Sequence, residues 1–576
     1  MRRFASASAM LAVSLLICGA ALAAPSSPSP SQANSLAKRH MIVAAEPDAS
    51  KAGRLMLREG GSAVDAAIAA QMVLTLVEPQ SSGIGGGSYL VVSDGAALHA
   101  YDGRETAPAS AHPKMFLDEQ GRPRRSSEVI PGGLSVGVPG TVAVLAMAHK
   151  AHGRLPWARL FEPAIRLADQ GFLVQPRLAR ELEGGSARYG AMPGLRALFF
   201  NPDGTPVRAG QTVRNPELAA SLREIAGKGP DAFYRGAIAD QIVQAVADAP
   251  RNRAVLTRED MASYQAKSRE PLCAAYRLYR ICSVPPSTSG GVTVLQILAL
   301  LERFPSAQLQ PTTLSAVHLV SEASRLAYAD RDRWLGDPDF VSVPLQGLLD
   351  RGYVEMRSRL IDPQRSMGTA RAGMPPVRQG ALIDYAPQPP QIEMGTSHLS
   401  VVDERGQVVS MTTTIEAGFG AQITAGGFVL NNELTDFTFE PVLDGRPVAN
   451  APGAGKRPLS SQAPVIVFGP DGRLLASLGS PGGRFIIAYV AQALVNLIDG
   501  QLSMPAVAAA PRHANLNGPT IIESGTNLER LAPMLSSMGH QVRLNGFDSG
   551  VNGIRRVADG YEGGADPRRE GVALGD

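Results

Sequence analysis

Hydrophobic positions in the upstream part of the chain recur with the spacing of α-helices. Apolar residues return about every four positions over 63–77, and Ser62, a residue type that caps helix N-termini, stands directly before them. This pattern predicts a helix over 63–77. Residues 315–334 predict a second, longer helix on the same grounds.

A different pattern lies between these helices. The runs 88–92 and 98–101 are rich in strand-forming residues and flank Asp94-Gly95, a dipeptide that is typical of tight hairpin turns. We therefore expect two antiparallel strands here. Arg104 would then lie just beyond the end of the second strand.

Downstream of Thr396 the spacing of hydrophobic residues shortens to the two-residue period of β-strands. It returns to the helical period over 487–498. Helices, then sheets, then helices indicate stacked layers of secondary structure, so the sequence alone predicts an α/β or α+β protein. The expected strands are 397–403, 408–414, 428–430, 464–468 and 474–478, with turns at Glu404-Arg405-Gly406 and Asp471-Gly472.

Composition indicates a globular protein and excludes few functions. The 576 residues are 44% hydrophobic, which is enough for a large core, and 60 glycines with 44 prolines predict many tight turns. The net charge is only +3, from 55 basic and 52 acidic residues, and long single-sign blocks are missing from the sequence. Nucleic-acid binding therefore has no support.

The first residues resemble a secretory signal. Arg2-Arg3 precede an apolar stretch over about 10–22, and Ala21-Leu22-Ala23 has the small residues of a cleavage site. We interpret 1–23 as a signal peptide, with a retained membrane anchor as the alternative, and expect export to the periplasm. Residues 26–34 would form a flexible mature N-terminus. No later stretch offers the roughly 20 apolar residues of a membrane span.

Two cysteines, Cys273 and Cys282, remain after the signal peptide. They flank Tyr276-Arg277-Leu278-Tyr279, and a two-residue turn at Arg277-Leu278 would place the cysteines opposite each other on a hairpin. An oxidising compartment permits a disulfide between them. Two reduced, buried thiols are the alternative, because Arg-Leu is not a favoured tight-turn pair. A metal site is not predicted, since no histidine is nearby.

The Gly395-Thr396 peptide is the point of greatest chemical interest. If the chain were cut there, Thr396 would become an N-terminal residue whose hydroxyl is the nucleophile and whose own α-amine, with a pKa of about 7.7–8.0, is the base. Gly395 has no Cβ and can adopt the strained backbone that attack on its carbonyl requires. His398 lies nearby in the sequence, and we expect an orienting or packing role for it.

Several segments place these residues in a wider pattern. They occur in the order Pro79-Gln80-Ser81-Ser82-Gly83-Ile84-Gly85-Gly86-Gly87, Arg104-Glu105-Thr106-Ala107-Pro108, Pro285-Pro286-Ser287-Thr288-Ser289-Gly290-Gly291, Tyr328-Ala329-Asp330-Arg331, Asn431-Asn432-Glu433, Lys456-Arg457-Pro458-Leu459-Ser460-Ser461 and Gly479-Ser480-Pro481-Gly482-Gly483-Arg484. With these segments the chain resembles the γ-glutamyltranspeptidases, which are self-cleaving N-terminal-nucleophile hydrolases. The resemblance covers nearly the whole mature chain and implies a four-layer αββα sandwich. It also implies a large subunit over 24–395 and a small catalytic subunit over 396–576, which together form one composite domain.

The resemblance implies a role for each matching residue. Thr396 matches the nucleophile, and Thr414 matches the threonine whose hydroxyl orients it. Gly482 and Gly483 match the backbone oxyanion hole. The substrate-binding positions are Arg104, Ser460 and Ser461 for the α-carboxylate and Asp436, Glu433 and Glu416 for the α-ammonium.

The implied activity is cleavage of the γ-glutamyl amide of glutathione and related compounds, through an ester on Thr396. Water, an amino acid or a peptide would accept the γ-glutamyl group, and no cofactor or metal is implied. A cephalosporin or glutaryl acylase on the same scaffold is the alternative enzyme, and a non-catalytic secreted binding protein is the alternative of another class. Three acidic residues favour a substrate that carries an α-amino group.

Residues 437–460 correspond to a segment that forms a lid over the bound group in some relatives. In this chain the segment looks shorter and has no aromatic residue after Phe439. We expect an open loop here, so that water competes well with acceptor amines. A plain connection between two strands is the alternative interpretation.

Overall fold

Two seven-stranded β-sheets lie face to face in this computed structural model, which describes residues 35–377, 382–389 and 395–576. Neighbouring strands within both sheets are antiparallel. The first sheet has the strand order β1 (Ser35–Ala37), β22 (Gly560–Ala565), β21 (Asn552–Val557), β17 (Leu474–Gly479), β16 (Val465–Phe468), β9 (Tyr279–Ser283) and β8 (Leu272–Tyr276). The second has the order β23 (Val572–Gly575), β2 (Met41–Ala44), β10 (Ser397–Val402), β11 (Val408–Thr414), β3 (Gly87–Ser93), β4 (Leu98–Gly103) and β7 (Lys267–Arg269).

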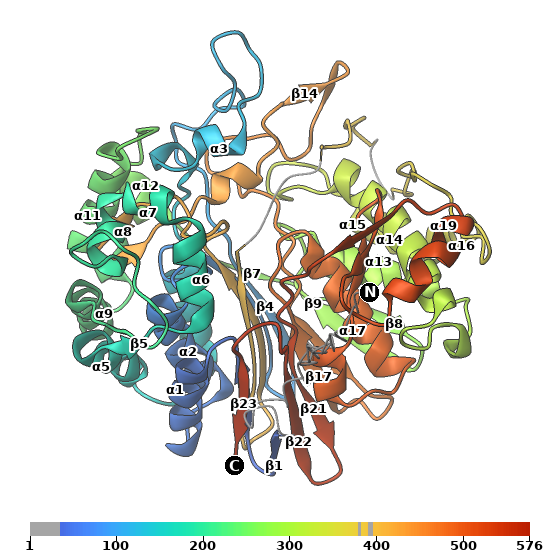
Figure 1. Ribbon diagram of the computed structural model, residues 1–576, viewed down its shortest axis with the longest axis horizontal. Coiled ribbons are helices and arrows are strands. Elements are labelled where there is room, and N and C mark those ends of the chain that lie inside the picture. The colour runs from blue at the N-terminus through green and yellow to red at the C-terminus, as the bar shows by residue number, and fades with distance from the viewer. Residues whose placement is uncertain (1–34, 378–381, 390–394) are drawn as a thin grey trace, which may run out of the picture. The chain divides into compact units, whose positions relative to one another are not determined.

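Helices cover the outer face of each sheet, as Figure 1 shows, with one helical layer to the left of the two sheets and one to the right. The left-hand layer includes α1 (Pro47–Arg58), α2 (Ala63–Val77), α5 (Glu162–Gln170) and α9 (Pro216–Lys228). The right-hand layer includes α13 (Gly290–Leu301), α14 (Leu314–Trp334) and α17 (Phe485–Ile498). The predicted αββα sandwich is therefore confirmed.

Hydrophobic side chains on both faces of the strands explain why the protein has three apolar layers. On β3, Leu90 and Val92 join the apolar cluster under α2, whereas Tyr89 and Val91 join the cluster between the sheets. On β16, Val465 and Val467 pack against the other helical layer. Successive side chains of a strand point to opposite faces, so each strand contributes to two of the three apolar layers.

The remaining elements are shorter or lie around this sandwich. The other helices are α3 (Ser126–Val129), α4 (Thr141–His152), α6 (Pro176–Gly184), α7 (Ser186–Gly190), α8 (Pro193–Phe199), α10 (Asp231–Tyr234), α11 (Ala237–Ala247), α12 (Arg258–Ser263), α15 (Leu345–Leu348), α16 (Arg351–Ser358), α18 (Met504–Ala509) and α19 (Ala532–Ser537). Small sheets pair β5 (Phe172–Leu173) with β6 (Thr212–Val213), β12 (Thr424–Ala425) with β13 (Phe428–Val429), and β14 (Val442–Leu443) with β15 (Arg446–Pro447). A further sheet joins β18 (His513–Asn515), β19 (Thr520–Glu523) and β20 (Val542–Asn545).

The predicted helices and strands agree with the structure to within a few residues. Ser62 caps α2 through a capping box with Asp65, and the predicted hairpin around Asp94 is β3 paired with β4. Arg104 directly follows β4, as expected. Across the described ranges, none of the helices combines the length and apolar character that crossing a bilayer requires. The predicted signal peptide, 1–23, and the stretch 26–34 lie outside the described residues.

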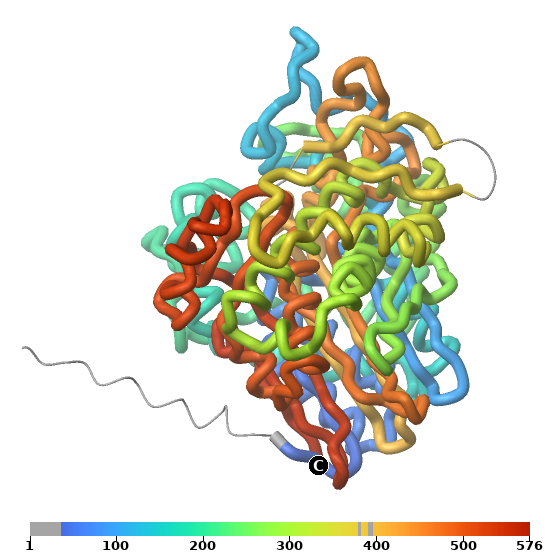
Figure 2. Tube along the Cα trace, turned by 90° about the vertical axis from the view of Figure 1, so that its right-hand side faces the viewer, coloured from blue at the N-terminus to red at the C-terminus, as the bar shows by residue number. Residues whose placement is uncertain are grey.

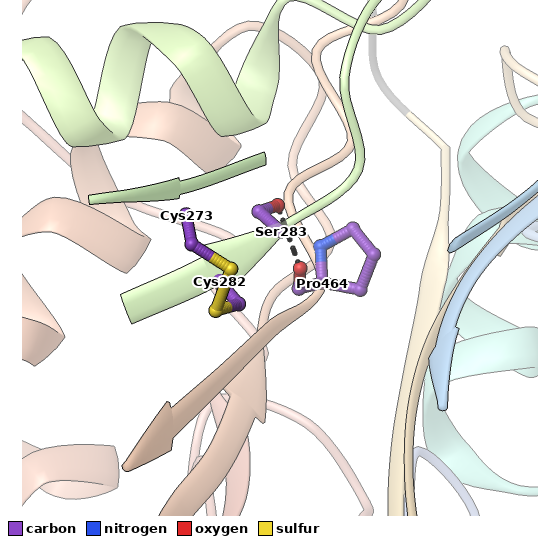
Figure 3. The surroundings of a disulfide bond; sticks show 4 residues. All are labelled: Cys273, Cys282, Ser283 and Pro464. Atoms are coloured by element: carbon purple, nitrogen blue, oxygen red, sulfur yellow. Dashed lines mark hydrogen bonds between the residues drawn. A yellow bond between two sulfur atoms is a disulfide. The ribbon is translucent and has the colours of Figure 1, made fainter. Parts of the chain in front are cut away.

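The cysteine hairpin has the predicted register. Tyr276 pairs with Tyr279 and Cys273 with Cys282 across β8 and β9, and the two cysteines are joined by a disulfide (Figure 3). Next to it, the Ser283 hydroxyl donates to the Pro464 carbonyl at 2.7 Å and fastens β9 to the start of β16.

The chain that leads toward Gly395 crosses the outside of the α14 layer and appears in yellow in Figure 2. Gly373 contacts α14 twice, through its N–H to Asp330 at 2.8 Å and its carbonyl to the Trp334 indole at 3.0 Å. Further on, the Gln388 N–H donates to the Asp332 carbonyl at 2.7 Å. These contacts hold both described parts of this segment against the same helix.

Candidate active site

Thr396 lies at the N-terminal end of β10, in the sheet interior. Residues after it pair with β11, with Ser397 opposite Thr413, and this register brings Thr414 at the end of β11 next to Thr396. The two hydroxyl oxygens are 3.4 Å apart. The Thr396 hydroxyl also contacts the Gly395 carbonyl oxygen, and its side chain is buried. The nucleophile candidate therefore lies against the bond that it is predicted to cut.

The Thr414 hydroxyl bridges two backbone groups. It accepts the Glu416 N–H at 2.8 Å and donates to the Gly395 carbonyl at 3.1 Å. A donor on the carbonyl oxygen polarises the carbonyl and stabilises the negative charge that develops there during attack. The position of Thr414 thus suits cleavage as well as orientation of Thr396.

A close backbone approach explains why glycine precedes Thr396. A Cβ on Gly395 would lie 2.1 Å from the Glu416 carbonyl oxygen, which also accepts the Gly395 N–H. Glu416 itself has a φ of +76°, a left-handed conformation that is costly for a residue with a side chain. Backbone strain at this site therefore lies at Glu416, whose carbonyl is in contact with Gly395.

Arg104 is buried and holds a fixed position at the end of β4. Its guanidinium donates to the Pro458 carbonyl at 3.0 Å and to the Leu459 carbonyl at 3.2 Å. It also forms ion pairs with Glu433 and, at 2.5 Å, with Asp436. Burial opposes the charged form, but these two carboxylates raise the pKa of Arg104 above its usual value.

The acidic residues around Arg104 outnumber it. Burial raises the pKa of Glu105 to about 8, which the guanidinium of Arg104 at 3.8 Å opposes. Burial likewise raises the pKa of Glu433, although Arg104 contacts it. One guanidinium faces several buried carboxyl groups here, so a second cation would favour their charged forms.

Ser460 and Ser461 are fixed by two segments that lie upstream of Thr396 in the sequence. The Ser289 N–H donates to the Ser460 carbonyl at 2.7 Å, and Arg331 donates to the Ser461 hydroxyl at 2.9 Å. Arg331 also donates to the Ser289 hydroxyl at 2.9 Å. Three of the segments that carry the family resemblance therefore meet at these two serines.

Gly482 and Gly483 connect β17 to the N-terminus of α17. Their φ angles are +128° and +56°, in the region that favours glycine. A Cβ on Gly482 would lie 2.6 Å from the Tyr489 ring. Backbone N–H groups at a helix N-terminus attract negative charge, so this position is suited to an oxyanion.

These residues surround one small cavity. It is lined by Arg104, Gly395, Thr396, Thr414, Glu416, Glu433, Asp436, Ser460, Ser461, Gln462, Gly483 and Ile486. The structure thus brings together the catalytic and substrate-binding residues that were predicted from the sequence. Gly482 is directly next to the lining residue Gly483. In this uncut chain, Gly395 itself lines the cavity beside Thr396.

His398 has no part in this cavity. Its ring packs on Gly479, where a Cβ would come within 2.3 Å of it, and its Nδ1 lies 2.9 Å from the Thr412 hydroxyl. Burial lowers the pKa of His398 to about 3, so the ring stays neutral. This agrees with the expected packing role.

Comparison with known proteins decides the family. The γ-glutamyltranspeptidase family model matches residues 49–576. The chain belongs to the γ-glutamyltranspeptidase family. Among its relatives is the glutathione hydrolase proenzyme of Escherichia coli, 37% identical over 546 residues, which are 92% of this chain and 91% of that protein.

Acylases of the same family are also similar. The acylase ACY 1 proenzyme of a Pseudomonas species is 36% identical, over 92% of this chain and 91% of its own. The crystal structure of a cephalosporin acylase from Bacillus halodurans superposes with a TM-score of 0.84 at 27% identity, covering 98% of this chain and 99% of that one. Both kinds of enzyme share the fold of this γ-glutamyltranspeptidase.

Two residues near the γ-glutamyltranspeptidase site were not selected from the sequence. Arg569, a buried residue, donates to the Thr396 carbonyl at 3.0 Å and to the Asp548 carbonyl at 3.0 Å. Nothing in the local sequence around Arg569 indicates this contact, 173 residues away. Glu105 follows Arg104 in a segment that was recognised, but its burial beside Glu433 depends on the fold.

Proposed function

We propose that this γ-glutamyltranspeptidase cuts itself before Thr396 and then hydrolyses or transfers the γ-glutamyl group of glutathione and related compounds. The observation that carries the proposal is the meeting of three groups in one cavity: Thr396, the cation Arg104, and the acids Glu433 and Asp436. A γ-glutamyl group needs all three, because its reacting carbonyl, its α-carboxylate and its α-ammonium lie close together.

Self-cleavage begins with the Thr396 hydroxyl. Its oxygen attacks the Gly395 carbonyl carbon, the peptide C–N bond breaks, and the Thr396 nitrogen takes up the hydroxyl proton. The resulting ester between Gly395 and the Thr396 oxygen, beside the α-amine that the first step has freed, is then hydrolysed by water, which releases the Gly395 carboxylate and restores the Thr396 hydroxyl. The Thr414 hydroxyl, 3.1 Å from the Gly395 oxygen, stabilises the oxyanion. The products are the large subunit, 24–395, and the small subunit, 396–576.

Catalysis repeats this chemistry on the substrate. The free α-amine takes the Thr396 hydroxyl proton, the oxygen attacks the γ-carbonyl carbon, and the amine partner leaves with a proton. Backbone N–H groups of Gly482 and Gly483 stabilise the oxyanion at the N-terminus of α17. Water or an acceptor amine then breaks the γ-glutamyl ester. Arg569, through the Thr396 carbonyl, keeps the new N-terminal residue in place.

Substrate recognition uses the charges of the cavity. Arg104, Ser460 and Ser461 bind the α-carboxylate, and Asp436, Glu433 and Glu416 bind the α-ammonium. A glutaryl substrate would draw Arg104 away from Glu433 and Asp436 without supplying an ammonium in its place, which favours a γ-glutamyl substrate over a glutaryl one.

The test compares two chromogenic anilides, γ-glutamyl and glutaryl, on the purified, processed enzyme. We expect faster hydrolysis of the γ-glutamyl compound. Asp436→Asn should reduce this hydrolysis about 10-fold to 150-fold, because a lost charge-assisted hydrogen bond costs about 1.5–3 kcal/mol. The glutaryl rate should change little in this variant. Faster glutaryl hydrolysis by the wild type would favour the acylase instead.

The compartment follows from residues 1–23, which we propose to be removed on export to the periplasm. Mass spectrometry of the exported protein should find one chain that begins at Ala24 and one that begins at Thr396. A single mass that retains 1–23 would support the membrane-anchor alternative.

A further inference from the structure

Three side chains that commonly bind metal ions meet at the outer corner of the second sheet, away from Thr396. Asp94 lies in the β3–β4 turn, His99 on β4, and His152 at the C-terminal end of α4. One potential ligand atom from each side chain lies within 4.8 Å of the other two. Two imidazoles and a carboxylate are a typical ligand set for Zn²⁺.

The separation of His99 and Asp94 fits coordination of one ion as well as it fits a long hydrogen bond. Nε2 of His99 lies 3.3 Å from Oδ2 of Asp94, whereas N–H···O bonds in proteins are mostly 2.7–3.2 Å long. Tetrahedral Zn²⁺ with bonds of about 2.0–2.1 Å places its ligand atoms roughly 3.3 Å apart. This pair is therefore already spaced as two ligands of one ion.

Neighbouring groups hold all three side chains in position. Oδ1 of Asp94 accepts the N–H groups of Ala96 and Ala97 at 2.9 and 2.7 Å, which leaves Oδ2 directed at His99. The Tyr101 hydroxyl lies 2.7 Å from Nε2 of His152. The two histidine rings are in contact, with centroids 4.7 Å apart. Hydrogen bonds of this kind orient ligands in metal sites.

The corner is accessible to an ion from solution. His99 and Asp94 each expose a third of their side chains, so an incoming ion can keep a water molecule as its fourth ligand. The buried group His318, Glu322 and His540 differs in this respect. There Arg325 donates to Glu322 at 2.8 Å, so a guanidinium already supplies the positive charge.

The corner is also remote from the catalytic centre. On β3, Gly87 pairs with Thr414 at one end, whereas Ser93 pairs with Leu98 at the other, beside the Asp94 turn. Seven residues of strand, about 3.3 Å each, separate the two ends. An ion at the corner would fasten the β3–β4 hairpin to α4 without contacting the reacting groups.

We propose that Asp94, His99 and one ring nitrogen of His152 bind Zn²⁺, with water completing a tetrahedral site. The ion is structural, because it joins a hairpin turn to a helix end. It raises the resistance of the processed enzyme to heat and leaves the chemistry at Thr396 unchanged.

The experiment measures Zn²⁺ bound per molecule by equilibrium dialysis of the chelator-treated, processed enzyme, followed by elemental analysis. We expect one ion per molecule and a thermal midpoint that rises when Zn²⁺ is added. His99→Gln and His152→Gln should each weaken binding more than about 100-fold, because loss of even outer-shell partners costs about 10–100-fold. His112→Gln, at an exposed histidine elsewhere, is the matched control and should bind as the wild type does.

Cobalt gives a second readout. Co²⁺ at this site should show the intense visible absorption of tetrahedral coordination in the wild type and lose it in His99→Gln. The proposal is overturned if His99→Gln and His152→Gln bind one Zn²⁺ as tightly as the wild type, or if His540→Gln alone removes the ion. It is equally overturned if the wild type binds none.

Discussion

Replacing Thr414 with valine should slow self-cleavage strongly, because valine keeps the shape of threonine and removes its hydroxyl. In the uncut chain this hydroxyl donates to the Gly395 carbonyl at 3.1 Å. Loss of one oxyanion donor usually costs about 2.7–4 kcal/mol, or about 10²–10³ in rate. The bond is longer than most O–H···O bonds. We therefore expect the lower end of that range, about 100-fold slower cleavage in Thr414→Val.

The assay follows a pulse of cell-free translation on denaturing gels, where the uncut chain and its two products separate. Thr414→Ser, which retains the hydroxyl, is the matched control and should cleave within a few-fold of the wild-type rate. Thr414→Val also removes the hydrogen bond from the Glu416 N–H to the Thr414 hydroxyl, which costs about 0.5–1.5 kcal/mol of stability. Thermal unfolding of the uncut variant must therefore show a folded protein.

A folded Thr414→Val protein that cleaves at the wild-type rate would refute this reasoning. The Gly395 oxyanion would then be stabilised by other groups, and Thr414 would only position Thr396. A folded variant that cleaves slowly while Thr414→Ser cleaves normally would assign the effect to the hydroxyl itself.

Four further predictions test other parts of the molecule. Thr396→Ala should stay one chain on a denaturing gel and lack activity, and cleavage before residue 396 in this variant would contradict the assignment. Arg104→Lys should raise KM about 10-fold to 150-fold, since an ammonium cannot replace a bidentate guanidinium; a KM within twofold of wild type would place the α-carboxylate elsewhere. With a millimolar dipeptide acceptor, free glutamate should remain a major product if 437–460 leaves the ester open to water, as its sequence predicts, and near-complete transfer would argue for a closed lid. Glu46→Gln should stabilise the fold increasingly from pH 5 to 8, and a thermal-midpoint difference that is constant with pH would exclude this effect.

The sign of the Glu46 effect follows from burial. Burial raises the pKa of Glu46 from 4.5 to about 8, and the nearby Asp48 carboxylate adds to the rise. Between these values the folded protein keeps a proton that the unfolded chain has lost, so the free energy of unfolding falls as pH rises through this window and is level above pH 8. Glutamine keeps an oxygen for the N–H groups of Asp48 and Ala49 at the start of α1 and removes the titration.

Local sequence patterns were sufficient for the elements that carry the site. Ser62 and the apolar spacing after it located α2, and the turn at Asp94 located the β3–β4 hairpin that ends next to Arg104. Such features depend on residues a few positions apart, whose effects on the backbone are similar in most contexts. The sequence does not decide between a disulfide and two reduced thiols, because the turn residues, Arg277-Leu278, are unusual. Arg277 adopts a φ of +56° there, which its local sequence does not favour.

Contacts between residues far apart in the sequence can be predicted only from the family resemblance, and some of them cannot be predicted at all. Arg104 and Glu433 are 329 residues apart, and recognised family segments were needed to associate them. Arg569 is not predicted from the sequence because it lies in the charged stretch Arg568-Arg569-Glu570, and such residues are usually exposed. Its role depends on burial against Thr396, and burial of a single charged side chain has no local signature in the sequence.

The structure also gives the acidic residues of the cavity a partner within the protein. From the sequence, Asp436 and Glu433 are partners of a substrate ammonium, whereas in the uncut chain they are partners of Arg104. A substrate carboxylate that takes Arg104 would leave two desolvated carboxylates, which is costly unless a new cation replaces it. A zwitterionic γ-glutamyl group brings that cation on the same carbon atom, so the number of ion pairs is maintained. The same exchange would penalise a substrate with a carboxylate alone, so we expect the charge balance of the cavity to select for the α-amino group.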